Sequence, residues 1–255
     1  MRDLNGKVAW ITGAGTGIGA SSALALAAAG MRVVLSGRRA EQLSEVAEAI
    51  TSAGGSARIA MLDVADAESV AAVAEDIARH DGRVDVLVNS AGINVQRRNW
   101  KHLSRADWDQ VLRIDLDGAF YCCHAVLPIM REQQDGLIIN ISSWAGRHVS
   151  TTTGPAYSAA KFGMNAFTES INVEECINGI RATALCPGEV ATPILDKRPI
   201  PVTAADRARM VQADDCGELV LFLARMPAHV CINDVTISPT WNRGYVGQAD
   251  RKSVV

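Results

Sequence analysis

A tyrosine and a lysine four residues apart, Tyr157 and Lys161, are the pair in this sequence best suited to acid–base chemistry. On a helix, residues four apart lie on the same face, one turn from each other. A phenol with a pKa near ~10 is a poor acid or base at neutral pH, but an ammonium group beside it favours the phenolate. Ser142 and Ser143 precede the pair, and a serine hydroxyl can donate or accept a hydrogen bond. These residues predict a device that moves a proton on and off an alcohol or carbonyl oxygen. The Tyr-x-x-x-Lys spacing also occurs by chance on helices, so its weight depends on the rest of the chain.

A nucleotide cradle is predicted near the N-terminus. Residues 7–12 form a short apolar run, a glycine-rich turn follows at 13–19, and residues 20–29 have a helix-forming composition. This order points backbone N–H groups and the positive end of a helix dipole at a phosphate. No Gly-Lys-Ser/Thr follows the turn, which excludes a P-loop, whereas a plain tight turn remains the alternative. The expected cofactor contacts here are Gly13, Thr16, Gly17, Ile18 and Gly19.

The second expected strand, residues 31–36, is followed by Arg38 and Arg39. An NAD site would have an Asp or Glu here for the ribose 2′-hydroxyl. The first acid is Glu41, and guanidinium groups form charge-assisted bonds with phosphate oxygens. The pattern favours NADP, with NAD as the alternative if both arginines are solvated residues at a helix start.

Together these motifs resemble the short-chain dehydrogenases/reductases. Thr12-Gly13-x-x-x-Gly17-x-Gly19, Asn89-Ser90-Ala91-Gly92, Ser143, Tyr157-x-x-x-Lys161 and Pro187-Gly188 stand in the family's order, and the resemblance runs from about Gly6 to about Thr240. It implies that Tyr157 is the general acid/base. Lys161 would lower the pKa of that phenol and hold the nicotinamide ribose. Ser143 would orient the substrate oxygen, and it is preferred to Ser142 because the second serine of the pair is the usual catalytic one.

The resemblance also implies further cofactor contacts. Asp63 and Val64 match the adenine contacts, and Thr192 matches the residue that holds the nicotinamide carboxamide. The remaining matches are Asn89, Ala91, Gly92, Pro187, Gly188 and Val190.

One position departs from the family pattern. The fourth catalytic residue is usually an Asn three residues before a Gly, and here Asp115 stands before Gly118. The family's Asn presents its main-chain carbonyl to a relay water, which any residue can do. The side-chain tether differs, however, so the relay through Asp115 is open.

The C-terminal stretch, residues 227–240, is similar to the NADP-dependent 3-hydroxy acid dehydrogenase branch. This resemblance favours a small alcohol/carbonyl pair such as a 3-hydroxy acid as the substrate. A carboxylate substrate needs a cation near the site, and Arg147, Lys197 and Arg198 are the candidates, although each is more often a solvated surface charge. His148 is more often a loop residue than a second base.

The elements that must position these residues alternate between apolar strands and Ala-rich helices. We expect strands near Val8, Val33, Ile59, Val86, Ile139, Ala184 and Val235. Alternation of this kind predicts an α/β fold, a single-domain doubly wound parallel sheet of Rossmann type with helices on both faces. The first four strands are short apolar runs, which predicts burial on both sides. Residues 1–255 are expected to form one dinucleotide-binding and catalytic domain, with 189–212 as a substrate lid.

Composition limits the alternatives. The net charge of −3 gives no support for nucleic acid or an anionic membrane as a partner. The six cysteines show no metal-ligand spacing, so no metal site is expected. Of the adjacent Cys122 and Cys123, one is expected to be exposed.

The chain shows no signal peptide and no apolar run of transmembrane length, which favours a cytoplasmic protein. The family resemblance implies a homotetramer or homodimer. The alternative function is a catalytically impaired nucleotide-binding sensor or scaffold of the same fold.

Overall fold

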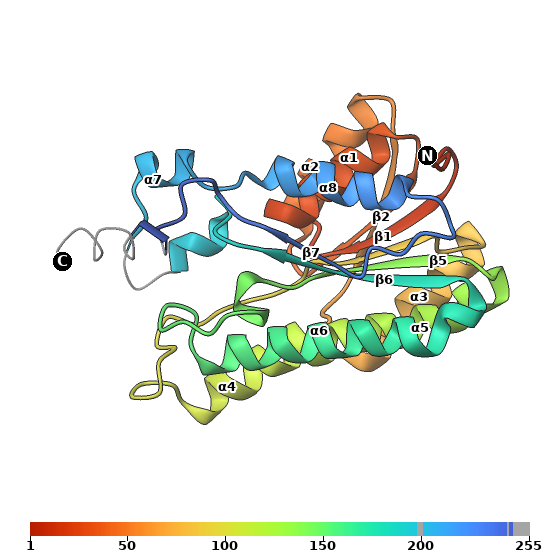
Figure 1. The fold of residues 1–255 in the computed structure, drawn as a ribbon. Helices are drawn as coiled ribbons and strands as arrows, with labels where there is room; N and C mark the ends of the chain where they lie inside the picture. The colour runs from red at the N-terminus through yellow and green to blue at the C-terminus, as the bar shows by residue number, and fades with distance from the viewer. Residues whose placement is uncertain (198–200, 244, 247–255) are drawn as a thin grey trace.

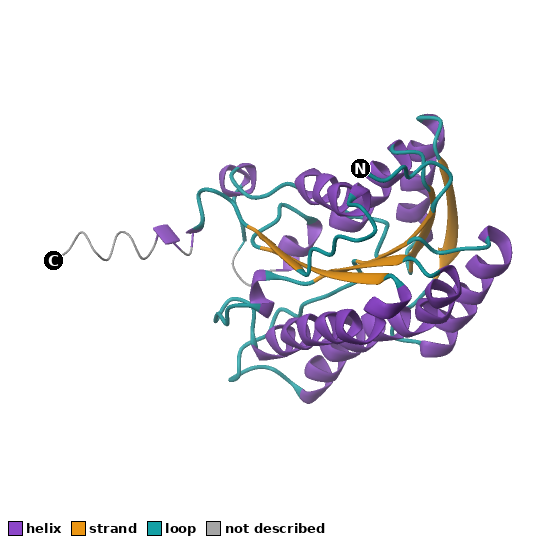
Figure 2. Ribbon diagram, turned by 45° about the vertical axis from the view of Figure 1, so that its right-hand side comes forward, coloured by secondary structure: helices purple, strands orange, loops and turns teal. Residues whose placement is uncertain are grey.

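The computed structural model describes residues 1–197, 201–243 and 245–246. Within them, a seven-stranded parallel sheet has the order β3-β2-β1-β4-β5-β6-β7 and carries helices on both faces (Figures 1 and 2). The strands are β1 Val8–Thr12, β2 Arg32–Gly37, β3 Ser56–Met61, β4 Val86–Asn89, β5 Gly136–Ile141, β6 Ile180–Pro187 and β7 Asp234–Ile237. The predicted doubly wound α/β fold is confirmed, and each strand includes or adjoins the residue around which it was expected.

Two helical layers enclose the sheet. Figure 1 shows α1, α2 and α8 above it and α3, α4, α5 and α6 below it. Each layer forms its own apolar core with one face of the sheet. The helices are α1 Gly17–Ala28, α2 Ala40–Ser52, α3 Ala67–Asp81, α4 Arg105–Leu112, α5 Gly118–Gln133, α6 Pro155–Glu175, α7 Ala204–Ala208 and α8 Ala213–Arg225. Shorter segments are the π-helical turn Arg113–Asp117 and the 3₁₀ turns Trp144–Gly146, Cys176–Asn178 and Pro193–Lys197.

The position of β1 between β2 and β4 creates the crevice that a ligand can use. From β1 the chain moves outward to β2 and β3, and then returns to β4 on the other side of β1. The loops that leave β1 and β4 therefore separate at the carboxyl ends of the strands. In open α/β sheets this switch point is where ligands bind.

The expectation that β3 is buried on both sides was wrong. β3 lies at the edge of the sheet and pairs on one side only, with β2. Ile59 is 36% exposed and Met61 is 49% exposed, whereas every residue of β1 and β4 is buried. An apolar run indicates a strand, but its burial is decided by whether a neighbour covers it.

The expectation for the adjacent cysteines was also wrong, because Cys122 and Cys123 are both buried. Their helix α5 contacts strands of the sheet and also α3, so two of its sides are covered. Asn89 Nδ2 lies 3.3 Å from Cys123 Sγ, on the side toward the sheet. None of the described helices has both the length and the apolar character needed to cross a bilayer.

Candidate active site

A cavity of about 1120 Å³ opens at the carboxyl ends of the strands. Its walls come from the loops after β1, β2, β3, β4, β5 and β6 and from the first turns of α6. The predicted residues that line it are Gly13, Thr16, Gly17, Ile18, Arg38, Arg39, Asp63, Val64, Ala91, Gly92, Ser143, Tyr157, Lys161, Pro187, Gly188, Val190 and Thr192. Residues spread over 180 positions of the sequence thus meet around one space.

The glycine-rich turn is shaped for close approach. Gly13 has a φ of +62°, and a Cβ placed there would lie 2.8 Å from the backbone nitrogen of Ala91. Gly17 has a φ of +57° and begins α1. The side chain of Thr16 makes no capping hydrogen bond, so the first-turn N–H groups of α1 have no side-chain cap. A helix start of this kind suits a phosphate, and the turn therefore fits the diphosphate of a dinucleotide.

Arg38 and Arg39 stand at the far end of the cavity, after β2. Arg39 Nη2 donates to Thr16 Oγ1 at 3.1 Å, and Arg38 Nη1 lies 3.7 Å from Asp63 Oδ2. The Arg38 and Asp63 side chains are 58% and 44% exposed, so their ion pair is solvated and contributes little to stability. Glu41 is exposed on α2 and is not part of the wall. The ribose end of the cradle therefore carries two guanidinium groups.

Tyr157 and Lys161 lie at the other end of the cavity, near the start of α6. Pro155 occupies the first turn, where its missing N–H costs nothing, and it fixes where the helix begins. Lys161 Nζ lies 5.5 Å from the centroid of the Tyr157 ring, as the one-turn spacing predicts. Lys161 is 3% exposed and donates from Nζ to the carbonyl oxygen of Ile141 at 3.0 Å. This bond fixes the ammonium at the end of β5.

The two serines differ in what holds them. Ser142 is buried, and its Oγ donates to the carbonyl of Lys161 at 3.3 Å. Ser143 is half-buried, and its Oγ accepts from the Ala145 N–H at 3.1 Å. An accepting hydroxyl keeps its own hydrogen available. Ser143 is therefore the serine that is free to donate into the cavity.

Three predicted site residues lie behind the wall rather than on it. Asn89 Nδ2 donates to Asn140 Oδ1 at 2.8 Å, which ties β4 to β5. A Cβ at Gly19 would collide with the carbonyl of Gly13, so this glycine lets α1 pack closely on the turn. Asp115 is completely buried, with Oδ2 3.6 Å from Lys161 Nζ.

The cavity wall also contains charged residues that the sequence did not single out. Arg98 is 8% exposed, lines the cavity and donates from Nη1 to the Thr152 carbonyl at 3.4 Å. Arg243 Nε donates to Glu189 Oε2 at 2.8 Å, and both residues line the same space. Arg98 lies in an irregular loop, where no periodicity indicates which side chain points inward.

Arg147 is a surface charge in this structure, as the sequence favoured, and not a carboxylate clamp. Its Nη2 lies 2.9 Å from Asp234 Oδ1, and the residue is not part of the cavity wall. Arg198 and the side chain of Lys197 lie outside the described part of the chain. His148 does line the cavity, and its ring centroid lies 4.7 Å from that of Trp144, with the two ring planes tilted by 37°.

The segment expected to form a lid borders the cavity. Val190 and Val211 form an isolated parallel bridge that brings the two ends of residues 190–211 together. Between these two ends, Pro193, Ile194, Leu195, Pro201 and Val202 line the cavity. The lid itself stays a prediction.

Comparison with known proteins agrees with this geometry. The family model for short chain dehydrogenases matches residues 7–200. An uncharacterized oxidoreductase of Staphylococcus saprophyticus is 35% identical over 240 residues, which cover 94% of this chain and all of the relative. An uncharacterized oxidoreductase of Bacillus subtilis is 38% identical over 198 residues, 77% of this chain and 71% of the relative.

Solved structures share the overall fold of this chain. A metagenomic short-chain oxidoreductase, determined in complex with NADP, has a TM-score of 0.82 at 32% identity and covers 94% of this chain and 100% of its own. An alcohol dehydrogenase of the archaeon Thermococcus sibiricus, complexed with 5-hydroxy-NADP, has a TM-score of 0.84 at 26% identity, with 93% and 98% covered. The chain therefore belongs to the short-chain dehydrogenase/reductase family and is an NAD(P)-dependent oxidoreductase.

Proposed function

We propose that this oxidoreductase prefers NADP and interconverts a small alcohol and its carbonyl compound, with a 3-hydroxy acid as the substrate class. The observation that carries the proposal is the cavity itself. It runs from a glycine-rich helix start flanked by Arg38 and Arg39 to a Tyr–Lys pair and a serine hydroxyl. When bound, the nicotinamide ring supplies or accepts the hydride.

The residues of this chain handle the proton and the substrate oxygen. In alcohol oxidation Tyr157, as the phenolate, takes the hydroxyl proton, and Ser143 donates a hydrogen bond to the same oxygen. Lys161 holds its positive charge beside Tyr157 and favours the phenolate. In carbonyl reduction the same groups act in reverse, because the phenol then gives its proton to the oxygen.

NADP preference is supported by charge at the ribose end. A 2′-phosphate placed between Arg38 and Arg39 would gain charge-assisted bonds, and the region has no carboxylate suited to a free 2′-hydroxyl except Asp63, which already lies beside Arg38. The solved relative that binds NADP is consistent with this proposal.

A carboxylate-bearing substrate is supported by Arg98. Its side chain is buried at the wall near residues 152–154, one turn before Tyr157 on the chain. Arg98 is itself only 8% exposed, and a guanidinium so poorly solvated attracts a carboxylate more strongly than it would in water. Arg98 is therefore the residue that we propose as the carboxylate clamp.

Apolar side chains on two outer helices support an assembly of several copies. Phe120 on α5 and Phe162 on α6 are 49% and 43% exposed, and apolar helix faces of this kind support a homodimer or homotetramer. A cytoplasmic location also remains a prediction.

Reduction of NADP and, separately, NAD by the purified protein tests the proposal, with a panel of 3-hydroxy acids, sugars and neutral secondary alcohols. The expected result is turnover of a 3-hydroxy acid with NADP. Activity only on neutral alcohols would remove the carboxylate from the proposal, and activity only with NAD would remove the cofactor preference.

A further inference from the structure

Asp115 presents a buried carboxylate to the catalytic lysine. The residue is 0% exposed and lies in the π-helical turn Arg113–Asp117 between α4 and α5. Its Oδ1 accepts from the Ile93 N–H at 2.8 Å. Its Oδ2 has no hydrogen-bond partner among the described residues and lies 3.6 Å from Lys161 Nζ.

The local backbone makes room for this carboxylate. A π-helical turn inserts one residue into a helix and redirects the side chains around it, often at functional sites. A Cβ at Gly92 would lie 3.2 Å from Asp115 Oδ2, so the glycine leaves the oxygen uncrowded. The turn and the glycine together place a charged group where hydrophobic packing would otherwise be expected.

Lys161 is the main charged neighbour of Asp115. Burial raises the pKa of Asp115 to about 6, while the positive charge of Lys161 and the Ile93 N–H act to lower it. Tyr157 is also a neighbour of Lys161, with its ring centroid 5.5 Å from Nζ. Cys122 and Cys123 on α5 are buried, and burial raises the pKa of both thiols, so they are neutral. On its own turn, Asp117 is half-buried.

We propose that Asp115 is a positioning residue whose carboxylate pairs with Lys161 and offsets part of the positive charge that Lys161 directs at Tyr157. Lys161 is then held by two groups, the Ile141 carbonyl and the Asp115 carboxylate. The ammonium favours the phenolate less strongly than it would alone, and the tyrosine needs a higher pH to act as a base. This inference rests on the proposed role of Tyr157.

The change Asp115→Asn tests the charge with little change of shape. The amide oxygen can still accept from Ile93, so the turn should fold, and thermal unfolding checks that it does. Without the negative charge of Asp115, the full positive charge of Lys161 stabilises the Tyr157 phenolate, and the pKa of the phenol falls. The acid limb of kcat/KM against pH, measured in alcohol oxidation, should move to lower pH by about one pH unit.

Asp117→Asn is the matched control, since it removes a carboxylate from the same turn without touching Lys161. Its pH profile should superpose on that of the wild type. An Asp115→Asn profile that superposes on the wild type would overturn the proposal. A shift of equal size in Asp117→Asn would do the same, because it would show a general change in charge.

A second measurement needs no turnover. The carboxyl signal of Asp115, identified in ¹³C-aspartate-labelled protein by its absence in Asp115→Asn, is titrated in the cofactor-free wild type and in Lys161→Met. If the pair exists, loss of the ammonium should raise the titration midpoint by at least about one pH unit. An unchanged midpoint contradicts the pairing. If the wild type turns over no substrate, the proposed function fails, while this titration still decides the pairing.

Discussion

At the scale of single residues, Tyr157 and Lys161 have different environments although they stand one turn apart on α6. Lys161 is buried and tied to the Ile141 carbonyl, whereas Tyr157 is half-buried at the cavity wall. A fixed cation beside an accessible phenol is the arrangement that the proposed proton transfer needs, because the phenol would meet the substrate while the cation would lower the pKa of the phenol.

Tyr157→Phe removes the hydroxyl and leaves the ring. We expect turnover to fall by about 10²–10⁴, which corresponds to roughly 3–5 kcal/mol of barrier. Steady-state kinetics would measure the loss, and fluorescence titration with NADPH would show that cofactor binding persists. Turnover within threefold of the wild type would contradict the role of Tyr157 as the acid/base.

Arg38→Asp places a carboxylate where the 2′-phosphate is expected. Loss of charged hydrogen bonds worth about 1.5–3 kcal/mol should weaken NADPH tenfold to a hundredfold and favour NADH. Titration with each cofactor separates the two effects. If the wild type already binds NADH more tightly than NADPH, the proposed preference is wrong.

Arg98→Gln tests the substrate clamp against a neighbour on the same loop. Arg98 is 8% exposed at the cavity wall, whereas Arg97 is exposed and lies outside it. For a 3-hydroxy acid we expect KM to rise at least about tenfold in Arg98→Gln, since a charge-assisted bond is lost. KM should stay unchanged in Arg97→Gln. Equal effects in both variants would indicate only a loss of net charge.

At the scale of elements, the glycine-rich turn combines two demands on its backbone. Gly13 needs a positive φ, and it also needs the absence of a Cβ because Ala91 is close. Gly6 has a φ of +71°, but no atom lies within 4 Å of the point where its Cβ would stand, so it shares only the first demand.

Gly13→Ala and Gly6→Ala therefore separate strain from close contact. Gly6→Ala should lower the free energy of unfolding by the cost of a left-handed alanine, about 1 kcal/mol, with a matching fall in Tm, and leave NADPH binding unchanged. Gly13→Ala should lower Tm further and weaken NADPH at least about tenfold. Differential scanning fluorimetry and NADPH titration measure both effects. Equal NADPH affinity in the two variants would show that the turn does not approach the cofactor.

The parts of the site that the sequence could predict are those held within one element. The Tyr157–Lys161 spacing, the glycine turn and the pair of arginines after β2 depend on local geometry, and the structure brings all of them to one cavity. Arg98 and Arg147 both lie in loops, where the choice between cavity and surface depends on distant partners. Arg147 turns to Asp234 on β7, 87 positions away, which no local pattern indicates.

The prediction of which residues are buried was limited in the same way. The strands were predictable because apolar runs alternate with helices, but the exposure of β3 depends on its place at the sheet edge. The burial of both Cys122 and Cys123 depends on α3 standing beside α5. These outcomes follow from which elements are neighbours in the fold, and the periodicity of the sequence does not reveal that.

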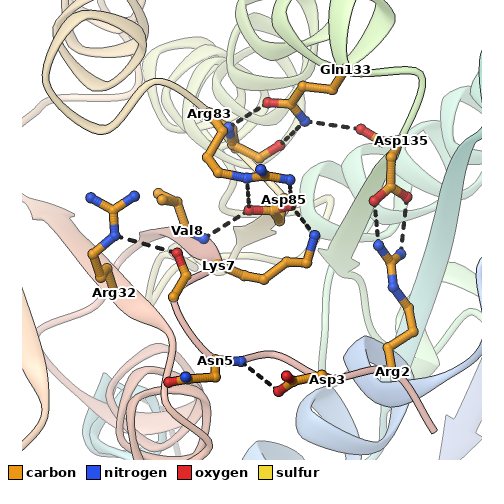
Figure 3. A network of polar contacts seen from close by, with 12 residues as sticks. Arg2, Asp3, Asn5, Lys7, Val8, Arg32, Arg83, Asp85, Gln133 and Asp135 are labelled. Carbon is orange, nitrogen blue, oxygen red and sulfur yellow. Dashed lines mark hydrogen bonds and ion pairs between the residues drawn. The ribbon is translucent and has the colours of Figure 1, made fainter.

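At the scale of the whole molecule, the end of the sheet opposite the cavity is held by charged groups. Figure 3 shows the carboxylate of Asp85 at the centre of this network, with Arg83, Lys7 and Val8 around it. The Val8 N–H donates to Asp85 at 2.9 Å, and Lys7 Nζ donates at 3.2 Å. Gln133 bonds the Val84 backbone from α5, and Arg2 pairs with Asp135. The start of β1 is thereby joined to the start of β4 and to the end of α5, away from the residues proposed to do the chemistry.

Asp85→Asn should therefore lower stability without changing the site. Burial acts to raise the pKa of Asp85, but hydrogen bonds from Arg83, Val8 and Lys7 outweigh it and hold the pKa below its ordinary value. A carboxyl whose pKa is depressed in the folded state stabilises the protein above its unfolded pKa, near ~4, and loses that effect as pH falls through the folded pKa. At pH 7 we expect the free energy of unfolding of Asp85→Asn to be about 2 kcal/mol below that of the wild type, since one charge of a largely buried network is removed. Urea unfolding at pH 7 and at pH 3.5 should show this difference shrinking at the lower pH, while kcat at pH 7 stays within twofold of the wild type. A difference that persists undiminished at pH 3.5 would mean that shape, and not charge, holds this end of the sheet.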